Sequence, residues 1–368
     1  MASYTGPTLA LTSRPAPALY TYKPLPAQHC WRCKQSKVVF SISPRTARPS
    51  ATKKPSAYWG GRLPKRLDAP TQLFRTKTGF LSPVACLPRS TDGNFQTGSA
   101  MKPLDNVFHE LHKNGLLILA NVSDAGGARV VESLGATAIA TSSAGMAWAH
   151  GYADGNQLPL TRLAASVESM TRILHVPLTV DIEAGYSDDL QHVVRVVEAV
   201  VTSGAVGINI EDGTAPPEVL VRKIEVAREV ANKHGVNLFI NARSDVYLKS
   251  LVPASQRLDE IIRRAALYAQ AGANGLFAAG MVTPAEISTL CNASTLPVNL
   301  LARDGLSAPE ELQRLGVRRL SAGSSIAEFL YGAMEGLARS FIERGQLDTQ
   351  ALTGFTYGKL NGLMGERG

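Results

Sequence analysis

Short apolar runs alternate with longer segments of helical periodicity through the last two thirds of the chain, and this alternation constrains the fold more than any other feature. Eight runs of four or five residues are each followed by a segment whose apolar side chains recur at helical spacing. The runs cover residues 116–120, 137–141, 178–181, 207–210, 238–241, 275–278, 298–301 and 319–322. The helical segments cover residues 124–134, 160–174, 188–203, 217–234, 255–271, 284–291, 308–315 and 325–344. Parallel strands joined by crossover helices have this order.

Glycine follows several of the helical segments directly before the next run. Gly135, Gly204, Gly272 and Gly316 occupy this place, where a residue with left-handed backbone ends a helix. Eight strand–helix units in about 240 residues fit a closed α/β barrel of the (β/α)8, or TIM, type. The alternative is an open doubly wound sheet, but residues 121–127 lack the glycine fingerprint of nucleotide-binding sheets. The pattern therefore favours the barrel.

Charge divides the chain at about residue 100. Residues 1–100 hold 15 Lys and Arg against two acidic residues, whereas residues 101–368 hold 23 against 28. The sequence therefore predicts a disordered basic leader over 1–100 and one catalytic barrel domain over 101–368. An acid-poor leader with Arg and Ser is typical of a transit peptide to the mitochondrion or another organelle. It could instead be a plain disordered tail, or lie upstream of a start at Met101, which would leave the protein cytoplasmic.

Composition also argues against nucleic acids and membranes as partners. The basic charge belongs to the leader, so the barrel has no net basic charge with which to attract a polyanion. No apolar stretch approaches the roughly 18–20 residues that span a bilayer. We therefore expect a small molecule as the partner.

Active sites of such barrels lie at the carboxyl ends of the strands, and acidic residues gather there in this chain. Asp181 ends the third run and Glu183 lies two residues beyond it, Glu211 directly follows the fourth run, and Asp154 follows the second in a loop. In an extended strand, Asp181 and Glu183 would point to the same side. Buried carboxylates need compensation, and oxygen ligands without His or Cys favour Mg²⁺ or Mn²⁺. These four residues are therefore the expected metal site, while Asp212 could start the following helix.

Basic and small residues at neighbouring strand ends could bind the substrate. Arg243 lies two residues after the fifth run, at the expected end of its strand, and its guanidinium suits bidentate binding of a carboxylate or phosphate. A loop of small residues follows the second run, and its backbone N–H groups could hold the other end of an anion. The loop consists of Ser142, Ser143, Ala144 and Gly145.

These motifs resemble those of the isocitrate lyase / phosphoenolpyruvate mutase superfamily. Residues 180–186, Val-Asp-Ile-Glu-Ala-Gly-Tyr, are similar to its metal-binding strand, and residues 207–212 and 241–245 are similar to its next two strand ends. Residues 142–154 are similar to its substrate loop. The resemblance extends over about residues 105–345, which is nearly all of the patterned region.

The resemblance implies a (β/α)8 barrel, often with the last helix exchanged between paired subunits, and a homodimer or homotetramer. It implies Mg²⁺ held by Asp181 and, mostly through water, by the other three acidic residues. It also implies that Arg243 and the backbone of residues 142–145 bind a small 2-oxo or 2-hydroxy carboxylate. The chemistry shared by the superfamily is the formation or use of an enolate stabilised by the metal.

One loop departs from the superfamily pattern. The lyases carry Lys-Lys/Arg-Cys-Gly-His after the Glu-Asp pair of the fourth strand, with the Cys as acid. Here Glu211 and Asp212 are followed by Gly-Thr-Ala-Pro-Pro-Glu at residues 213–218. This short loop also lacks the Lys and Asn of the mutase gating loop. The differences argue against isocitrate or methylisocitrate lyase activity and against formation of a carbon–phosphorus bond.

The sequence therefore predicts a Mg²⁺-dependent carbon–carbon lyase or decarboxylase acting on a small 2-oxo or 2-hydroxy (di)carboxylate. Arg243, Tyr186 and Asp154 are the expected catalytic residues, with water, Tyr186 or Tyr152 protonating the enolate. Decarboxylation needs no acid at the leaving group, so it tolerates the absence of the Cys. Two alternatives stay open: phosphonate chemistry of the phosphoenolpyruvate mutase type, and a non-catalytic barrel that binds a dicarboxylate.

Overall fold

The computed structural model describes residues 103–347 and 354–365. The leader predicted over residues 1–100, with its transit-peptide function, and the alternative start at Met101 lie outside these residues.

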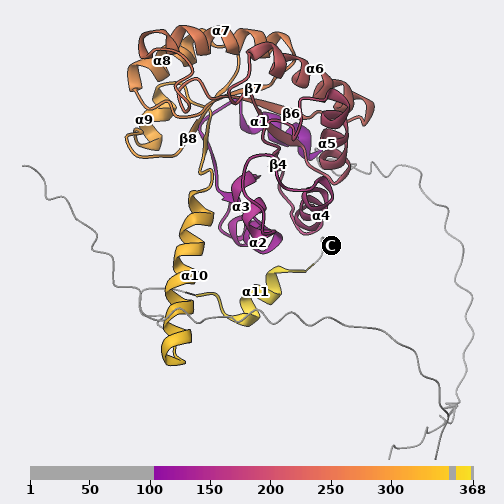
Figure 1. Ribbon diagram of the computed structural model, residues 1–368, viewed down its shortest axis with the longest axis vertical. Coiled ribbons are helices and arrows are strands. Elements are labelled where there is room, and N and C mark those ends of the chain that lie inside the picture. The colour runs from indigo at the N-terminus through magenta and orange to yellow at the C-terminus, as the bar shows by residue number, and fades with distance from the viewer. Residues whose placement is uncertain (1–102, 348–353, 366–368) are drawn as a thin grey trace, which may run out of the picture. The chain divides into compact units, whose positions relative to one another are not determined.

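Nine parallel strands form one sheet, in the order β1-β9-β8-β7-β6-β5-β4-β3-β2 (Figure 1). They are β1 (Leu117–Leu119), β2 (Asn121–Val122), β3 (Ile139–Thr141), β4 (Leu178–Asp181), β5 (Gly207–Glu211), β6 (Phe239–Ser244), β7 (Gly275–Ala278), β8 (Val298–Leu301) and β9 (Arg319–Ser321). Only Ala120 separates β1, which pairs with β9, from β2, which pairs with β3. The two ends of the sheet thus meet at one interrupted strand, and the nearly closed barrel confirms the predicted fold class.

The eight predicted helical segments all appear as helices. They are α2 (Ala125–Ser133), α4 (Leu160–Thr171), α5 (Leu190–Thr202), α6 (Pro217–Lys233), α7 (Arg257–Gln270), α8 (Pro284–Ala293), α9 (Pro309–Arg314) and α10 (Ser325–Arg344). Asp124 and Asp189 cap α2 and α5 by accepting backbone N–H bonds. Gly204 and Gly316 have φ of 95° and 96°, so the left-handed helix ends expected there are confirmed.

Three short helices among the described residues were not predicted. They are α1 (Leu104–Leu111), α3 (Ser143–Ala149) and α11 (Tyr357–Leu363). The apolar residues of α1 follow the helical spacing i, i+3, i+4, i+7, so its signal was present in the sequence. The other two are too short for periodicity to reveal them. The predicted segment 255–271 begins as a 3-10 turn, η1 (Ala254–Gln256), which leads directly into α7.

Helix α1 closes the amino-terminal end of the barrel. Phe108 is fully buried, and its ring centroid lies 5.4 Å from that of Phe239, the first residue of β6. A Cβ on Gly207, the first residue of β5, would lie 2.7 Å from Phe108 Cε1, so only glycine fits there. Because this end is filled, the barrel can open only at the carboxyl ends of its strands.

The outer helices bury apolar faces against the sheet. Val193, Val196, Val197 and Val200 of α5 are fully buried at the spacing of one helix face. Burial of such side chains is worth roughly 1.5–3 kcal/mol each, so this layer holds the strand ends at fixed positions. Within the described residues, no helix is both long enough and apolar enough to cross a membrane.

Helix α10 differs from the others because most of it is uncovered. It leaves the barrel after β9 and extends beyond the other helices (Figure 1). Leu330, Met334 and Phe341 lie on one stripe of the helix and are 64%, 55% and 56% exposed. A stripe of this kind commonly marks an interface.

Candidate active site

A cavity of about 390 Å³ opens at the carboxyl ends of the strands. Most of the predicted site residues line it: Ser142, Ser143, Ala144, Asp154, Asp181 and Arg243. Four predicted residues do not line it: Gly145, Glu183, Tyr186 and Glu211. The barrel thus brings the expected strand ends together, but it gives their side chains different surroundings.

Asp181 ends β4 at the wall of the cavity and is only 9% exposed. Its Oδ1 accepts a hydrogen bond from the backbone N–H of Glu183 at 3.0 Å, and its Oδ2 accepts one from Asn209 Nδ2 at 3.2 Å. Burial raises the pKa of Asp181, against the opposing effect of Arg243. A positive charge in the cavity would stabilise this buried carboxylate.

Glu183 does not continue the strand as predicted. Strand β4 stops at Asp181, and Glu183 has a left-handed backbone with φ of 51°, so the same-side argument for these two residues is wrong. Glu183 Oε2 instead accepts a hydrogen bond from the backbone N–H of Asn156, in the loop that carries Asp154. The buried Oε1 has no hydrogen-bond partner. Left-handed backbone at a non-glycine residue is costly, and such strain often occurs at functional sites.

Arg243 lines the cavity, but acidic side chains already occupy most of its guanidinium. Nε and Nη2 donate to the two carboxylate oxygens of Asp245 at 2.7 and 3.2 Å, and Nη1 lies 2.7 Å from Glu211 Oε2. The bidentate contact predicted with a substrate carboxylate is therefore made with Asp245. An arginine has five N–H donors, so two remain for a ligand.

Asp245 was not predicted as part of the site, although the sequence contained the signal. It lies two residues after Arg243 and directly follows β6, and in backbone that continues the strand the two side chains point the same way. Asp245 is fully buried and also contacts Lys249 Nζ at 2.8 Å. It therefore holds two cationic side chains beside the cavity.

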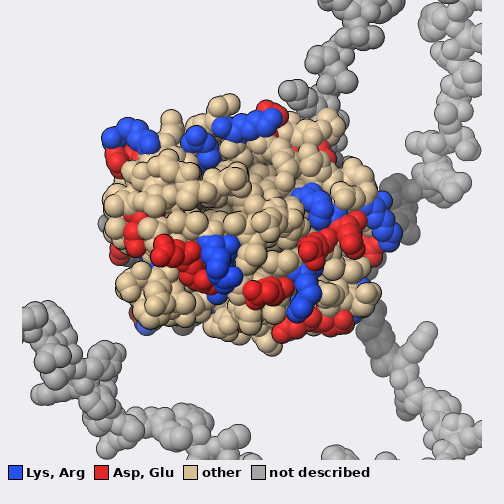
Figure 2. Space-filling view, turned by 90° about the horizontal axis from the view of Figure 1, so that it is seen from above, with Lys and Arg blue, Asp and Glu red and all other residues tan. Residues whose placement is uncertain are grey.

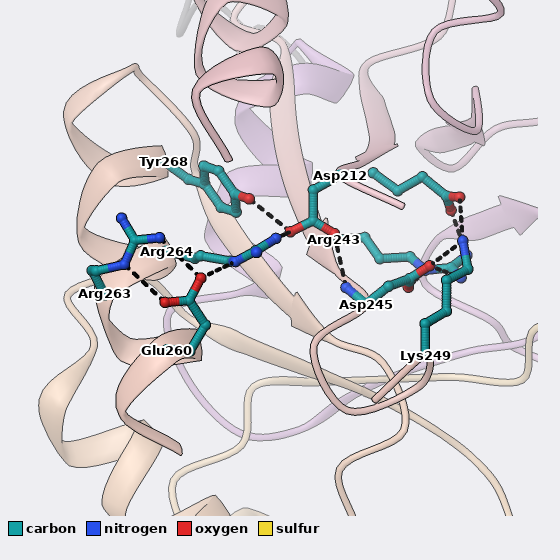
Figure 3. Close-up of polar contacts among 9 residues, drawn as sticks. Asp212, Arg243, Asp245, Lys249, Glu260, Arg263, Arg264 and Tyr268 are labelled. Carbon is teal, nitrogen blue, oxygen red and sulfur yellow. Dashed lines mark hydrogen bonds and ion pairs between the residues drawn. The ribbon is translucent and has the colours of Figure 1, made fainter. Parts of the chain in front are cut away.

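Asp212 does not start a helix, because α6 begins at Pro217. Its carboxylate accepts from Arg264 Nη1 and Tyr268 Oη, both at 2.7 Å, and from the backbone N–H of Asp245 at 2.9 Å. Figure 3 shows Asp212 between these α7 side chains on one side and Asp245 on the other. Asp212 thus links α7 to the segment that carries the partner of Arg243.

The small-residue loop forms the start of helix α3. Ser142 caps this helix, and its Oγ accepts from the backbone N–H of Gly145 at 3.2 Å, so that N–H is unavailable to an anion. A Cβ on Gly145 would clash with Ser123 Oγ and would lie 3.1 Å from Ala327 Cβ. Gly145 therefore permits close packing against its neighbours.

Tyr186 lies beside the acidic residues and outside the cavity lining. Its backbone is left-handed, and its N–H donates to Asn156 Oδ1 at 3.1 Å. Burial, together with the nearby Glu183 and Asp181, raises the pKa of the Tyr186 hydroxyl. The hydroxyl therefore keeps its proton across the physiological range.

The acidic residues form an electrostatic cluster without converging on one point. Burial and neighbouring acids raise the pKa of Glu183 to about 7, and burial raises the pKa of Glu211 to about 7 despite Arg243. Within residues 103–347 and 354–365, no three His, Cys, Asp or Glu side chains lie close enough together to form a ready cation site. The cavity itself offers the carboxylates of Asp181 and Asp154.

The outer surface shows no concentration of one charge sign on the face seen in Figure 2. Lys and Arg side chains alternate there with Asp and Glu side chains around an uncharged centre. Nucleic-acid sites usually present a continuous basic patch, and this face does not.

Comparison with known proteins agrees with this geometry. The family model for phosphoenolpyruvate phosphomutase matches residues 108–342. The chain belongs to this family. Similar proteins include oxaloacetate decarboxylases and structures described as a phosphonomutase and as a lyase/mutase, and the chain is an enzyme of the phosphoenolpyruvate mutase / isocitrate lyase superfamily.

Three relatives illustrate the range. An uncharacterised protein of Mycobacterium tuberculosis is 34% identical over 221 residues, which are 59% of this chain and 81% of the relative. The oxaloacetate decarboxylase of Bradyrhizobium diazoefficiens is 32% identical over 173 residues, which are 46% of this chain and 60% of that enzyme. The crystal structure of a candidate phosphonomutase from Burkholderia cenocepacia J2315 is 36% identical with a TM-score of 0.60, covering 64% of this chain and 99% of that one.

Proposed function

We propose that this protein is a Mg²⁺-dependent lyase or decarboxylase acting on a small 2-oxo or 2-hydroxy dicarboxylate. The observation that carries the proposal is the distribution of charge around the cavity. Asp181 and Asp154 line one side of the cavity. Arg303, which follows β8, also lines the cavity. When β1 and β2 are counted as one interrupted strand, the barrel is a ring of eight strands. In this ring β8 lies opposite β4, so Arg303 and Asp181 come from opposite walls.

The residues present fit Mg²⁺ or Mn²⁺. Mg²⁺ keeps several waters and takes one or two carboxylates directly, and the buried carboxylate of Asp181 together with Asp154 provides these. The buried Oε1 of Glu183, which has no partner, would gain from a cation nearby. When bound, the ion supplies positive charge that favours the build-up of negative charge on the substrate. Asp181 and Asp154 would hold it directly, with Glu183 and Glu211 further away.

Arg303 gives the cavity a second anion-binding end. Its side chain makes no ion pair within the part of the chain that the structure describes. The remaining N–H donors of Arg243 and the cavity-lining Ser142 and Ser143 lie on other strand ends. A dicarboxylate could thus place one carboxylate toward the metal end and the other against Arg303, as guanidinium groups bind carboxylates well.

Decarboxylation is the reaction that needs least from this site. The bond to the departing carboxylate breaks, CO₂ leaves, and the electron pair remains on the substrate as an enolate that takes a proton from water. No acid is needed at the leaving group, and the β5–α6 loop, Asp212 to Pro216, supplies no Cys or His. Tyr186, which keeps its proton but does not line the cavity, is a weaker candidate than water for this step.

A panel of 2-oxo and 2-hydroxy dicarboxylates, including oxaloacetate, tests the proposal by pyruvate and CO₂ release with Mg²⁺ and with chelator. We expect turnover that requires Mg²⁺ and that Asp181→Ala abolishes. Binding of the panel without turnover would favour the non-catalytic barrel. Conversion of phosphonopyruvate, followed by phosphorus NMR, would favour the mutase reaction instead. Full activity of Asp181→Ala would refute the site assignment.

We also propose that the uncovered stripe of α10 packs against a second copy of the chain, giving a homodimer or homotetramer with an exchanged helix. Leu330, Met334 and Phe341 are more than half exposed, which favours burial in such an interface. Light scattering should report a dimer or larger, and the double change Leu330→Glu, Phe341→Glu should give a monomer. Glu335→Gln, on the same helix, is the matched control. A monomeric unaltered protein would refute the proposal.

We further propose that residues 1–100 direct the protein to the mitochondrion or another organelle. Their acid-poor, Arg- and Ser-bearing composition supports this. A fluorescent protein fused to residues 1–100 should enter the organelle. The same fluorescent protein fused to residues 101–368, which begin at Met101, should stay in the cytoplasm. Equal distribution of the two fusions would contradict the proposal.

A further inference from the structure

Arg319, the first residue of β9, is buried inside the barrel beneath the cavity. It is 1% exposed, and within the described residues no carboxylate lies within ion-pair distance of it. Its Nη1 has no hydrogen-bond partner. Burial lowers the pKa of its guanidinium to about 9, with Asp181 acting in the opposite direction. A buried cation without a paired acid is costly, so its place in the barrel calls for an explanation.

The side chain of Arg319 crosses the barrel to Asn209. In the ring of strands β9 lies opposite β5, and Arg319 Nη2 donates to Asn209 Oδ1 at 3.1 Å. Asn241 Nδ2 donates to the same oxygen at 2.9 Å. Two donors on Oδ1 fix which way the Asn209 amide faces, so its Nδ2 donates to Asp181 Oδ2 at 3.2 Å.

We propose that Arg319 is a positioning residue, which acts through Asn209 to hold the Asp181 carboxylate in the orientation that receives the divalent cation. The inference rests on the proposed function, because that function makes Asp181 the main cation ligand. Hydrogen-bond partners of a metal-binding carboxylate typically change metal affinity 10–100-fold when removed. Arg319 would act one hydrogen bond further from the metal than Asn209 does, across the width of the barrel.

A purely structural role for Arg319 predicts a different outcome. If methionine replaces Arg319, Asn209 Oδ1 still accepts from Asn241, and Ser321 Oγ still donates to Asn299 Oδ1 at 3.2 Å. No buried acceptor among these loses its last partner. Exchange of an unpaired buried ion for an apolar side chain of similar volume is often neutral or stabilising. Arg319→Met should therefore keep or raise the unfolding temperature while it weakens metal binding.

The test measures Mn²⁺ binding by electron paramagnetic resonance, with thermal unfolding in parallel. Four proteins carry the changes Arg319→Met, Asn209→Ala, both together, and Arg228→Met as control. Arg228 is a half-buried arginine that donates to Gly272 O and Asn274 Oδ1, before β7 at the other end of the barrel. We expect about tenfold weaker Mn²⁺ binding for Arg319→Met, unchanged binding for Arg228→Met, and no further loss in the double variant beyond Asn209→Ala.

Each other outcome overturns the inference. Unchanged Mn²⁺ binding by Arg319→Met would show that the contact with Asn209 does not orient Asp181. Losses that add in the double variant would show that Arg319 acts independently of Asn209. A loss matched by Arg228→Met would show a general effect on folding. If the unaltered protein bound no Mn²⁺, the proposed metal dependence would fail together with this inference. If the unaltered protein bound Mn²⁺ and Arg319→Met bound it equally well, only the positioning role of Arg319 would fail.

Discussion

The ion pair between Asp212 and Arg264 should contribute more to stability than any exposed pair in this protein. The Asp212 side chain is fully buried and that of Arg264 is 7% exposed, with 2.7 Å between Oδ2 and Nη1. The same carboxylate accepts two further hydrogen bonds, from Tyr268 and from the backbone of Asp245. Asp212→Asn removes the negative charge. It also replaces one carboxylate oxygen by an NH₂ group, which cannot accept the hydrogen bonds that these N–H and O–H groups donate.

Breaking a buried pair by removing one partner typically costs about 3–5 kcal/mol. Arg264 also bonds Glu260 Oε1 at 2.7 Å, which leaves part of its charge compensated and favours the lower part of that range. Tyr268→Phe removes one hydrogen bond and leaves the ion pair, so about 1–2 kcal/mol is expected. The network therefore predicts a graded series of losses.

Urea unfolding, followed by circular dichroism, measures these losses as shifts in midpoint at constant slope. The control is Glu335→Gln, the same acid-to-amide change in a pair with Arg339 whose side chains are 69% and 62% exposed, where less than about 1 kcal/mol is expected. A loss for Asp212→Asn no larger than that of the control would refute the reasoning. So would a larger loss for Tyr268→Phe than for Asp212→Asn.

Three further outcomes are expected. Arg303→Met should raise KM for dicarboxylates about tenfold with little change in kcat, and should leave KM for a monocarboxylate unchanged; equal effects on both substrates would contradict the role of Arg303. The pKa values of Glu183 and Glu211, raised to about 7, mean that the metal-free protein holds these groups protonated below that pH. Cation binding favours the ionised form, so Mg²⁺ affinity measured by calorimetry should fall as pH drops from 8 to 6, and a flat profile would be evidence against these carboxylates. Gly207→Ala should lower the free energy of unfolding, measured in urea, by about 1–3 kcal/mol, because its Cβ would lie 2.7 Å from Phe108 Cε1. An unchanged midpoint would show that α1 can move aside.

The strand–helix order was predictable because period and capping are local properties of the sequence. The strands β4, β7 and β8 have the bounds that the apolar runs indicated. The first run, residues 116–120, is different: β1 occupies only residues 117–119, and the strand is interrupted at Ala120 before β2 begins at Asn121 and pairs with a different neighbour. That interruption depends on closure of the barrel, which no single run encodes.

The site was predictable in composition and less so in contacts. The acidic strand ends indicated which residues gather at the carboxyl ends, and Asp181, Asp154 and Arg243 do line the cavity. The same-side argument was wrong for Glu183, because the strand ends two residues earlier and its backbone turns left-handed. The same argument holds for Arg243 and Asp245, because β6 continues to Ser244, directly before Asp245, whereas the predicted run ended at residue 241.

The sequence by itself determined the order of strands and helices, the family, and the residue types at each strand end, because these follow from spacing along the chain. Only the tertiary structure decided which charges are paired. Closure of the barrel places β9 opposite β5 and β8 opposite β4, so Arg319 reaches Asn209 across 110 residues of sequence while Arg303 lies across the cavity from Asp181. The energy of a buried charge depends on its distance to other charges and to water, and those distances exist only after the ring of strands has closed.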